Sequence, residues 1–342
     1  MSPQSTPPIP PAPPAVVLLG VQRFNPTLGD AVKALGVTGR RAVITAGWQE
    51  REAEDDDLSA HLGGRTVNLR LHARGEELFT EDPELRAAHR ERQDALRHRQ
   101  DFYRIRLEHA LEADQVIGLR AAPPEIALDE AEVSIGAIRD LDRTHLTGCA
   151  KEHARFETKM QTATRHSVQR HREELARILV DCDSIGIAGG HVATLITRLV
   201  LFGIGQLAAG KTVFAWSGGA MAVTSRIVLF HDQPPQGPGA TEVLDAGLGL
   251  APGVIALPQP EQRLHLDQQA RLDRTVRRFA PDRCLLLPSR SWAALRGREL
   301  EASDGVSALL LGGGHQLLQG DRQQPPPPRK GPALTPKKGG RR

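Results

Sequence analysis

The alternation of short apolar runs with helical stretches constrains this chain more than any other feature. Apolar runs with the composition of buried strands begin at Ala15 (AVVLLG), Arg41 (RAVITAG) and Arg65 (RTVNLRL). The stretch TLGDAVKALG between the first two has the pattern of a short helix. Strands that are separated by helices form a parallel sheet with helices on its faces. The sequence therefore predicts an α/β fold.

A long helical block interrupts this alternation between about residues 83 and 180. Its apolar positions recur at helical spacing, and its remaining positions are rich in Arg, Glu and His. The Pro123-Pro124 pair ends the first helix, because proline cannot continue one. We expect helices over about 84–118, 125–147 and 150–180. We interpret the block as an inserted hairpin or small bundle that either covers the carboxyl end of the sheet or forms a homodimer with a second subunit.

The strand pattern resumes at Asp183 and continues almost to the end of the chain. Apolar runs of strand length are DSIGIAGG, KTVFAW, SRIVLF, GVIALP and RCLLLP. Residues 293–318 contain short strands with turn signals, which indicate an antiparallel meander at the sheet edge. The predicted fold is a flavodoxin-like, mostly parallel sheet with a large helical insertion and a small C-terminal antiparallel meander.

Proline-rich segments flank this predicted domain of residues 15–319. We expect residues 1–14 and 320–342 to be disordered, because proline removes backbone donors and prevents regular pairing. The first segment lacks the pattern of a signal peptide, and no apolar stretch is long enough to span a bilayer. The three cysteines form no CxxC pair. We therefore expect a cytoplasmic protein without membrane contact.

The charge distribution argues against nucleic-acid binding. The formal net charge is +3, but the tail after Asp321 contributes +7, which leaves −4 for residues 1–321. The predicted domain therefore lacks a basic field that would attract phosphates. Aromatic residues make up only 4% of the chain, so platforms for base stacking are scarce as well.

Two strand ends carry signals for chemistry. The run KTVFAWSGGAMAV places Ser217 between a predicted strand and a helix, followed by Gly218 and other small residues, as on a nucleophile turn. Its alternative is an ordinary turn with a capping serine. The run DSIGIAGGH ends a strand in Gly189, Gly190 and His191, so a backbone N–H can face a cavity and form half of an oxyanion hole. Its alternative is a plain strand-to-helix turn.

Together the segments AGGHVATL, AWSGGAMAV and GLGLAPGVIALPQP resemble the serine peptidases typified by dipeptidase E and cyanophycinase, within the class I glutamine amidotransferase-like superfamily. The resemblance covers residues 183–265 well and the first three strands loosely. It implies Ser217 as nucleophile, the N–H groups of Gly190 and Gly218 as the oxyanion hole, and Asp232 as an acidic partner. It implies a small peptide-like substrate, no metal and no other cofactor. Serine in place of cysteine makes glutaminase chemistry a poor fit.

The catalytic histidine of that family does not carry over. The alignment puts Gln259 at its position, and an amide nitrogen cannot take a proton from serine. His265 could serve instead, oriented by Asp267 or Glu261, and His191 and His231 are further substitutes. The alternative is a catalytically inactive relative that binds a ligand or partner through the same pocket and the helical insertion. Whether the chain is an enzyme therefore depends on which base reaches Ser217.

Two other patterns are expected to carry no chemistry. GQLAAGKT, residues 205–212, satisfies the phosphate-loop pattern, but a helix precedes it and a strand follows, which reverses the required order. The histidines of the insertion show no HxxxH or HExxH spacing, and we expect them at the surface rather than around a metal. These histidines are His89, His98, His109, His145, His153, His166 and His171.

Overall fold

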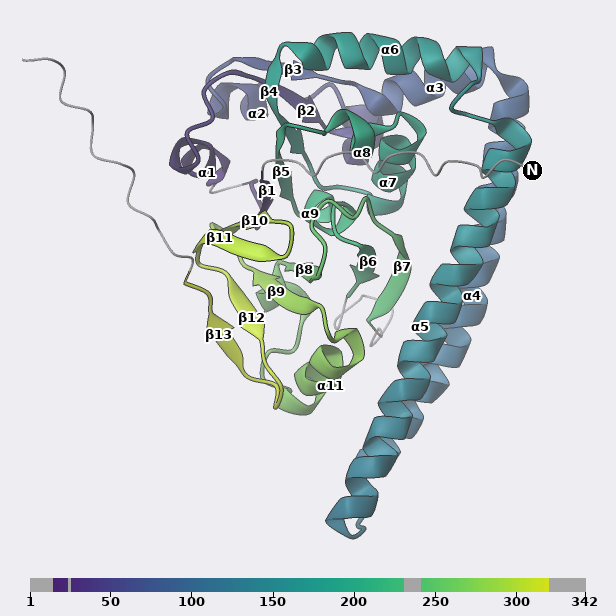
Figure 1. The fold of residues 1–342 in the computed structure, drawn as a ribbon, viewed down its shortest axis with the longest axis vertical. Helices are drawn as coiled ribbons and strands as arrows, with labels where there is room; N and C mark the ends of the chain where they lie inside the picture. Colours follow the sequence, from purple (N-terminus) through teal and green to yellow (C-terminus); the bar gives the residue numbers. More distant parts are fainter. Residues whose placement is uncertain (1–14, 24–25, 231–240, 320–342) are drawn as a thin grey trace, which may run out of the picture.

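The computed structural model describes residues 15–23, 26–230 and 241–319, and the predicted disordered segments 1–14 and 320–342 lie outside these residues. Its centre is a seven-stranded sheet with the order β11-β10-β1-β5-β4-β2-β3 (Figure 1). The five strands β1, β5, β4, β2 and β3 run parallel, which confirms the predicted α/β fold. The strands are β1 Val16–Leu19, β2 Arg40–Ile44, β3 Thr66–Asn68, β4 Cys182–Ile187, β5 Thr212–Trp216, β10 Trp292–Arg296 and β11 Glu299–Asp304.

Strand β1 lies between two strands that come much later in the chain. Val16 pairs with Val213 of β5 in parallel and with Leu295 of β10 in antiparallel register. Its side chains alternate between two apolar clusters on opposite faces of the sheet, with Leu18 in one and Leu19 in the other. A strand that is buried on both faces has the continuous apolar run that the sequence shows.

Helices cover both faces of this sheet. Helix α1 (Leu28–Ala34) packs on the face that holds Leu19, whereas α7 (Val192–Leu201) and α9 (Gly218–Ala222) contribute to the core of the other face. The remaining short helices are η1 Ala46–Arg51, α2 Asp56–His61, α3 Leu71–Glu81, α6 His166–Val180, α8 Ile204–Leu207, α10 Pro260–Arg263 and α11 Gln269–Phe279. After β3, at the edge of the sheet, the chain returns toward the centre through β4 and β5. The connections that leave the neighbouring strands β2 and β4 therefore run in opposite directions, and the loops after these two strands meet at a topological switch point, where such folds bind ligands.

The later strands form two further sheets. Strands β6 (Arg226–Leu229) and β7 (Glu242–Ala246) pair with each other. A four-stranded sheet has the order β13-β12-β9-β8, in which β8 and β9 are parallel. The predicted meander is therefore divided, because β10 and β11 join the large sheet and β12 and β13 join this one. The strands of the four-stranded sheet are β8 Val254–Pro258, β9 Arg283–Leu287, β12 Ser307–Leu309 and β13 His315–Leu317.

The insertion forms a long antiparallel hairpin of α4 (Pro83–Gly118) and α5 (Pro124–Met160), which runs along one side of the molecule and extends beyond α11 at its tip (Figure 1). Two helices lie between residues 124 and 180 as predicted, but the predicted break near residue 148 is wrong, because α5 continues through Gly148 to Met160 and α6 begins at His166. A Cβ atom on Gly148 would lie 2.8 Å from the guanidinium of Arg99 on α4. Glycine therefore serves close helix packing here and does not end the helix.

A buried polar cluster anchors the hairpin to the body. The Arg278 guanidinium of α11 donates to both carboxylate oxygens of Asp142 on α5, at 2.8 and 2.7 Å. The Tyr103 hydroxyl of α4 donates to Asp142 at 2.7 Å and accepts from the Val243 N–H of β7 at 3.1 Å. The Arg278 and Asp142 side chains are only 2% and 3% exposed, so removal of either partner would leave the other charge without compensation. The hairpin is therefore fixed at this point and is not a freely hinged arm.

Candidate active site

Ser217 has an unusual backbone conformation, with φ 54° and ψ −125°. Positive φ at a non-glycine residue outside the left-handed helical region costs on the order of 1–3 kcal/mol and persists only where the surrounding structure enforces it. Ser217 follows β5 directly and precedes α9, and its side chain makes no capping hydrogen bond to that helix. The strained turn therefore has no explanation in helix capping.

The loop after β4 lies against this turn. A Cβ atom on Gly189 would lie 2.5 Å from the Cβ of Ser217 and 3.0 Å from the N of Gly218. Gly190 has φ 104°, and a Cβ atom there would lie 2.3 Å from the carbonyl oxygen of Gly47. Glycine is required at both positions, because a side chain at Gly189 would push the ends of β4 and β5 apart and one at Gly190 would push the ends of β4 and β2 apart. The two segments that the sequence analysis singled out are therefore adjacent in space.

Two backbone N–H groups at this contact have no acceptor among the described residues. Gly218 is the first residue of α9, so its N–H has no acceptor within the helix. The Gly190 N–H has no hydrogen-bond acceptor among the described residues, whereas the neighbouring His191 N–H donates to the Gly47 carbonyl oxygen at 2.7 Å. Both unpaired donors therefore belong to the segments that meet at Ser217.

A second strained turn stands next to the first. Gln49, after β2, has φ 57° and ψ −123°, nearly the same values as Ser217. Its side-chain amide donates to the Thr194 hydroxyl at 3.2 Å, and Nδ1 of His191 accepts from the Thr194 N–H at 3.2 Å. These contacts connect the loops after β2 and β4 with the start of α7. His191 therefore caps this helix with one ring nitrogen.

A cavity of about 490 Å³ opens in front of Ser217. Gly189, Gly190, Trp48 and Trp216 line it, and the charged side chains that line it are exposed at its rim. A cavity of this size, apolar inside and with a few polar groups, is typical of a small-ligand site. The remaining lining residues are Val21, Gln22, Arg23, Pro26, Leu28, Gly47, Arg51, Glu54, Asp57, Leu58 and His61.

The rim carries both signs of charge. The Arg51 guanidinium donates to Oε2 of Glu54 at 2.8 and 2.6 Å, and this hydrogen bond lowers the pKa of Glu54. His61 is the one histidine among the described residues that line the cavity. Its Nε2 accepts from the Gly29 N–H at 3.1 Å, so the lone pair that a general base would use is already occupied.

The structure distributes the other sequence candidates over different places. Gln259 is in the left-handed conformation after β8, and its side-chain amide donates to Gln262 at 3.2 Å on the exposed surface. His265 follows α10, with Nδ1 4.0 Å from Oδ1 of Asp267. None of the three residues Gln259, His265 and His191 is among those that line the cavity. Asp232 and His231 lie outside the described residues.

Sequence reasoning missed Trp48, Arg51, Glu54, Asp57 and His61. They lie on η1, α2 and the turns beside them, which follow β2. The signal that could have found them is their place after a parallel strand, because ligands in such sheets bind outside the carboxyl ends of the strands. No local motif distinguishes them.

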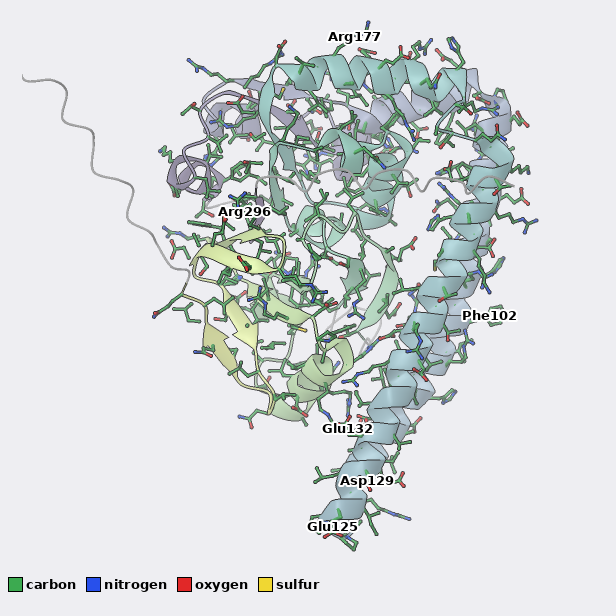
Figure 2. All side chains as sticks on the ribbon, viewed as in Figure 1. Phe102, Glu125, Asp129, Glu132, Arg177 and Arg296 are labelled. Atoms are coloured by element: carbon green, nitrogen blue, oxygen red, sulfur yellow. The ribbon has the colours of Figure 1, made fainter. Side chains whose placement is uncertain are left out.

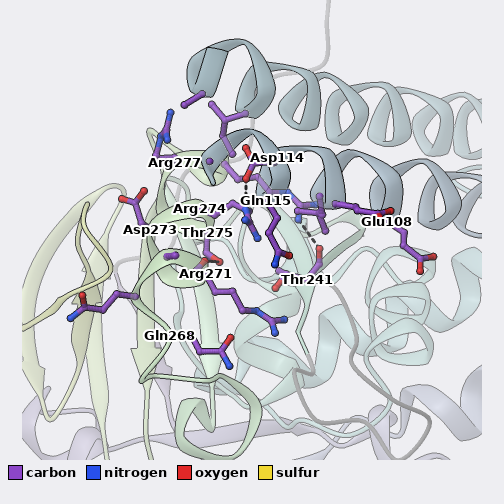
Figure 3. A pocket seen from close by; sticks show the side chains of 18 of the residues that line it. Glu108, Asp114, Gln115, Thr241, Gln268, Arg271, Asp273, Arg274, Thr275 and Arg277 are labelled. Carbon is purple, nitrogen blue, oxygen red and sulfur yellow. Dashed lines mark hydrogen bonds and ion pairs between the residues drawn. The ribbon is translucent and has the colours of Figure 1, made fainter. Parts of the chain in front are cut away.

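A larger groove of about 960 Å³ lies between the hairpin and α11 (Figure 3). Its cations are held in ion pairs between the two sides, including Arg274 with Asp114, Arg104 with Glu242 and Arg277 with Glu132. Paired charges of this kind fix one element on another. The groove is therefore a seam of the hairpin contact and does not extend the Ser217 cavity.

The predicted surface location of the insertion's histidines is wrong for His145 and His171, which are buried at 4% and 2% exposure and pack inside the helical contacts. The phosphate-loop pattern has a simple structural role. Gly210 has φ 76° after α8, and the Lys211 ammonium donates to the Cys182 carbonyl oxygen at 2.7 Å. Across residues 15–23, 26–230 and 241–319, no three His, Cys, Asp or Glu side chains are grouped to hold a metal. None of the helices in the described part of the chain has the length and apolar character to span a bilayer.

Comparison with known proteins finds similarity to solved structures but not to any family model or curated protein. Among solved structures, the fold is similar to the crystal structure of a peptidase from an acI-B1 Actinobacterium, with 12% sequence identity and a TM-score of 0.42. The match covers 90% of this chain and 94% of that one.

Proposed function

We propose that the protein hydrolyses an amide bond of a small peptide-like substrate, with Ser217 as the nucleophile. The conformation of Ser217 carries this proposal, because a serine that only capped α9 would need neither a positive φ nor an unbonded hydroxyl. A strained turn that presents a hydroxyl to a cavity is the arrangement of a nucleophile elbow.

The reaction follows from the groups around this serine. The Ser217 oxygen attacks the carbonyl carbon of the substrate, and its proton passes to a base. The N–H groups of Gly190 and Gly218 stabilise the negative oxygen of the tetrahedral intermediate. The amine leaves with a proton, and water then hydrolyses the ester that remains on Ser217.

Two histidines are the candidates for the base. His61 lines the cavity, but its Nε2 must first release the Gly29 N–H. His265 has a carboxylate neighbour in Asp267, and must move toward Ser217 to act. Catalysis by either therefore requires a rearrangement when substrate binds.

A second function is favoured by the occupied lone pair of His61 and by the amide of Gln259 at the position of the family's histidine. The protein would then be a relative without catalytic activity that binds a ligand in the same cavity. Trp48, which lines the cavity and is only half-buried, would offer such a ligand an aromatic contact.

A fluorophosphonate label separates the two functions. The hydrolase proposal expects stoichiometric labelling of wild type, loss of labelling in Ser217→Ala, and no loss in the matched variant Ser225→Ala, whose serine is exposed near the same helix. His61→Gln and His265→Gln identify the base by which of them slows labelling. An unlabelled wild type that binds small peptides equally well before and after Ser217→Ala would favour the binding function.

A further inference from the structure

The outer face of α4 carries an exposed apolar stripe. Phe102, Ile105, Val116 and Leu119 are 67%, 55%, 58% and 81% exposed. They lie in one row with His109 and Glu112, at alternating steps of three and four residues. This is the spacing of a coiled-coil seam. Apolar residues that are scattered singly over a surface would not be expected to follow it.

The row faces away from the rest of the hairpin. Tyr103 and Leu107 of α4 are buried toward α5, and at 3.6 residues per turn the stripe lies on the opposite side of the helix. Figure 2 shows Phe102 pointing outward, away from the body of the molecule. No other described segment covers these side chains, as their exposure shows.

We propose that a second copy of this chain packs on the stripe, with the two α4 helices antiparallel about a two-fold axis between residues 110 and 111. This register places Phe102 against the partner's Leu119 and Ile105 against the partner's Val116. Both contacts occur twice, as a two-fold interface requires. The row is therefore complementary to itself when one copy is reversed.

The two polar residues of the row determine this direction. In the antiparallel register His109 faces the partner's Glu112, so an imidazole N–H meets a carboxylate. In the single chain Nδ1 of His109 lies 3.9 Å from Oε2 of Glu112, and the two side chains are 77% and 74% exposed, so the dimer exchanges this contact for two contacts across the interface. A parallel pair would instead place Glu112 against the partner's Glu112, which is repulsive. Polar residues at one central layer of an otherwise apolar seam commonly fix its register.

The mass of the full chain in solution tests the dimer. We expect sedimentation at micromolar concentration to give twice 37.2 kDa for wild type and the single mass for Ile105→Glu combined with Val116→Glu. The matched control is Ile126→Glu with Val133→Glu, two exposed apolar positions on α5 outside the stripe, which should remain dimeric. Far-UV circular dichroism checks that each variant is folded. A monomeric wild type, or a control that dissociates equally, would overturn the proposal.

Cysteine crosslinking tests the direction. An oxidised mixture of Ile105→Cys chains and Val116→Cys chains should form covalent dimers, whereas each variant alone should not. The native cysteines do not interfere, because Cys149, Cys182 and Cys284 are all buried. Crosslinking of each variant with itself, without crosslinking of the mixture, would show a parallel pair and contradict the antiparallel register.

Discussion

Gly189 and Ser217 are in direct backbone contact, although the loops that carry them follow different strands. A Cβ atom added to Gly189 would lie only 2.5 Å from the Cβ of Ser217, which leaves no room for a side chain at this position. The position of the serine thus depends on a neighbour that contributes no side chain.

We expect Gly189→Ala to abolish labelling of Ser217 and to lower the free energy of unfolding by roughly 1–3 kcal/mol, because the added methyl group overpacks the contact. The control is Gly136→Ala on α5, where a Cβ atom meets nothing within 4 Å. That variant should be labelled normally and should be more stable by about 0.5–1 kcal/mol. Chemical denaturation and labelling measure both effects.

Ser217→Gly should raise the free energy of unfolding while it removes all activity. Glycine adopts φ 54° and ψ −125° without the steric cost that serine pays, so we expect a gain of about 1 kcal/mol. Ser217→Ala keeps the Cβ atom and should show no such gain. Equal stability of the two variants in urea would contradict the view that this turn is strained.

Arg278→Met should lower the free energy of unfolding by about 3–5 kcal/mol, because it leaves the Asp142 carboxylate buried without its cation. Asp94→Asn removes an exposed ion pair with Arg97 on the same hairpin and should cost less than about 1 kcal/mol. Adding Asp142→Leu to Arg278→Met should recover part of the loss. Urea denaturation of the three variants and wild type provides the comparison.

Acid should destabilise the protein through His89. Burial, together with the charges of Arg92 and Arg198, lowers the pKa of His89 from 6.5 to about 3. The unfolded chain therefore binds a proton between these values that the folded chain does not, and the free energy of unfolding falls as the pH drops from about 6.5 toward 3. His89→Gln should flatten this dependence, whereas His98→Gln, at an exposed position, should leave it unchanged. Equal slopes for all three proteins would contradict the assignment.

The central strands of the large sheet were predictable because they are continuous apolar runs between turn signals, as at β1 and β5. The adjacency of Gly190 and Ser217 was predictable for a related reason, since parallel neighbours end at the same sheet edge. In both cases the pattern of apolar runs along the sequence was enough to make the prediction. The resemblance to a peptidase family added roles to these residues but no geometry.

The rest of the site depends on tertiary arrangement that no local pattern encodes. Trp48 and His61 reach the cavity because the chain crosses from β1 to β2 over the positions of two later strands, β5 and β4. The sequence pattern does not indicate this order of strands in the sheet. The turn at Gln49 lacks glycine, so nothing in its residues signals a positive φ. The predicted gap between the helices 125–147 and 150–180 contains Gly148, which is instead a position of close packing against Arg99 on the other helix.

The placement of β1 between β5 and β10 determines when the fold can be completed. Its two partners begin at Thr212 and Trp292, so during synthesis the first strand has no neighbour until β5 has been made and lacks its second neighbour until β10 follows. The α4–α5 hairpin, by contrast, is held together mainly by contacts between its own two helices, so it can form before translation is complete. Residues 15–19 thus remain an unpaired apolar segment for most of translation, and this segment is where a chaperone would be needed first.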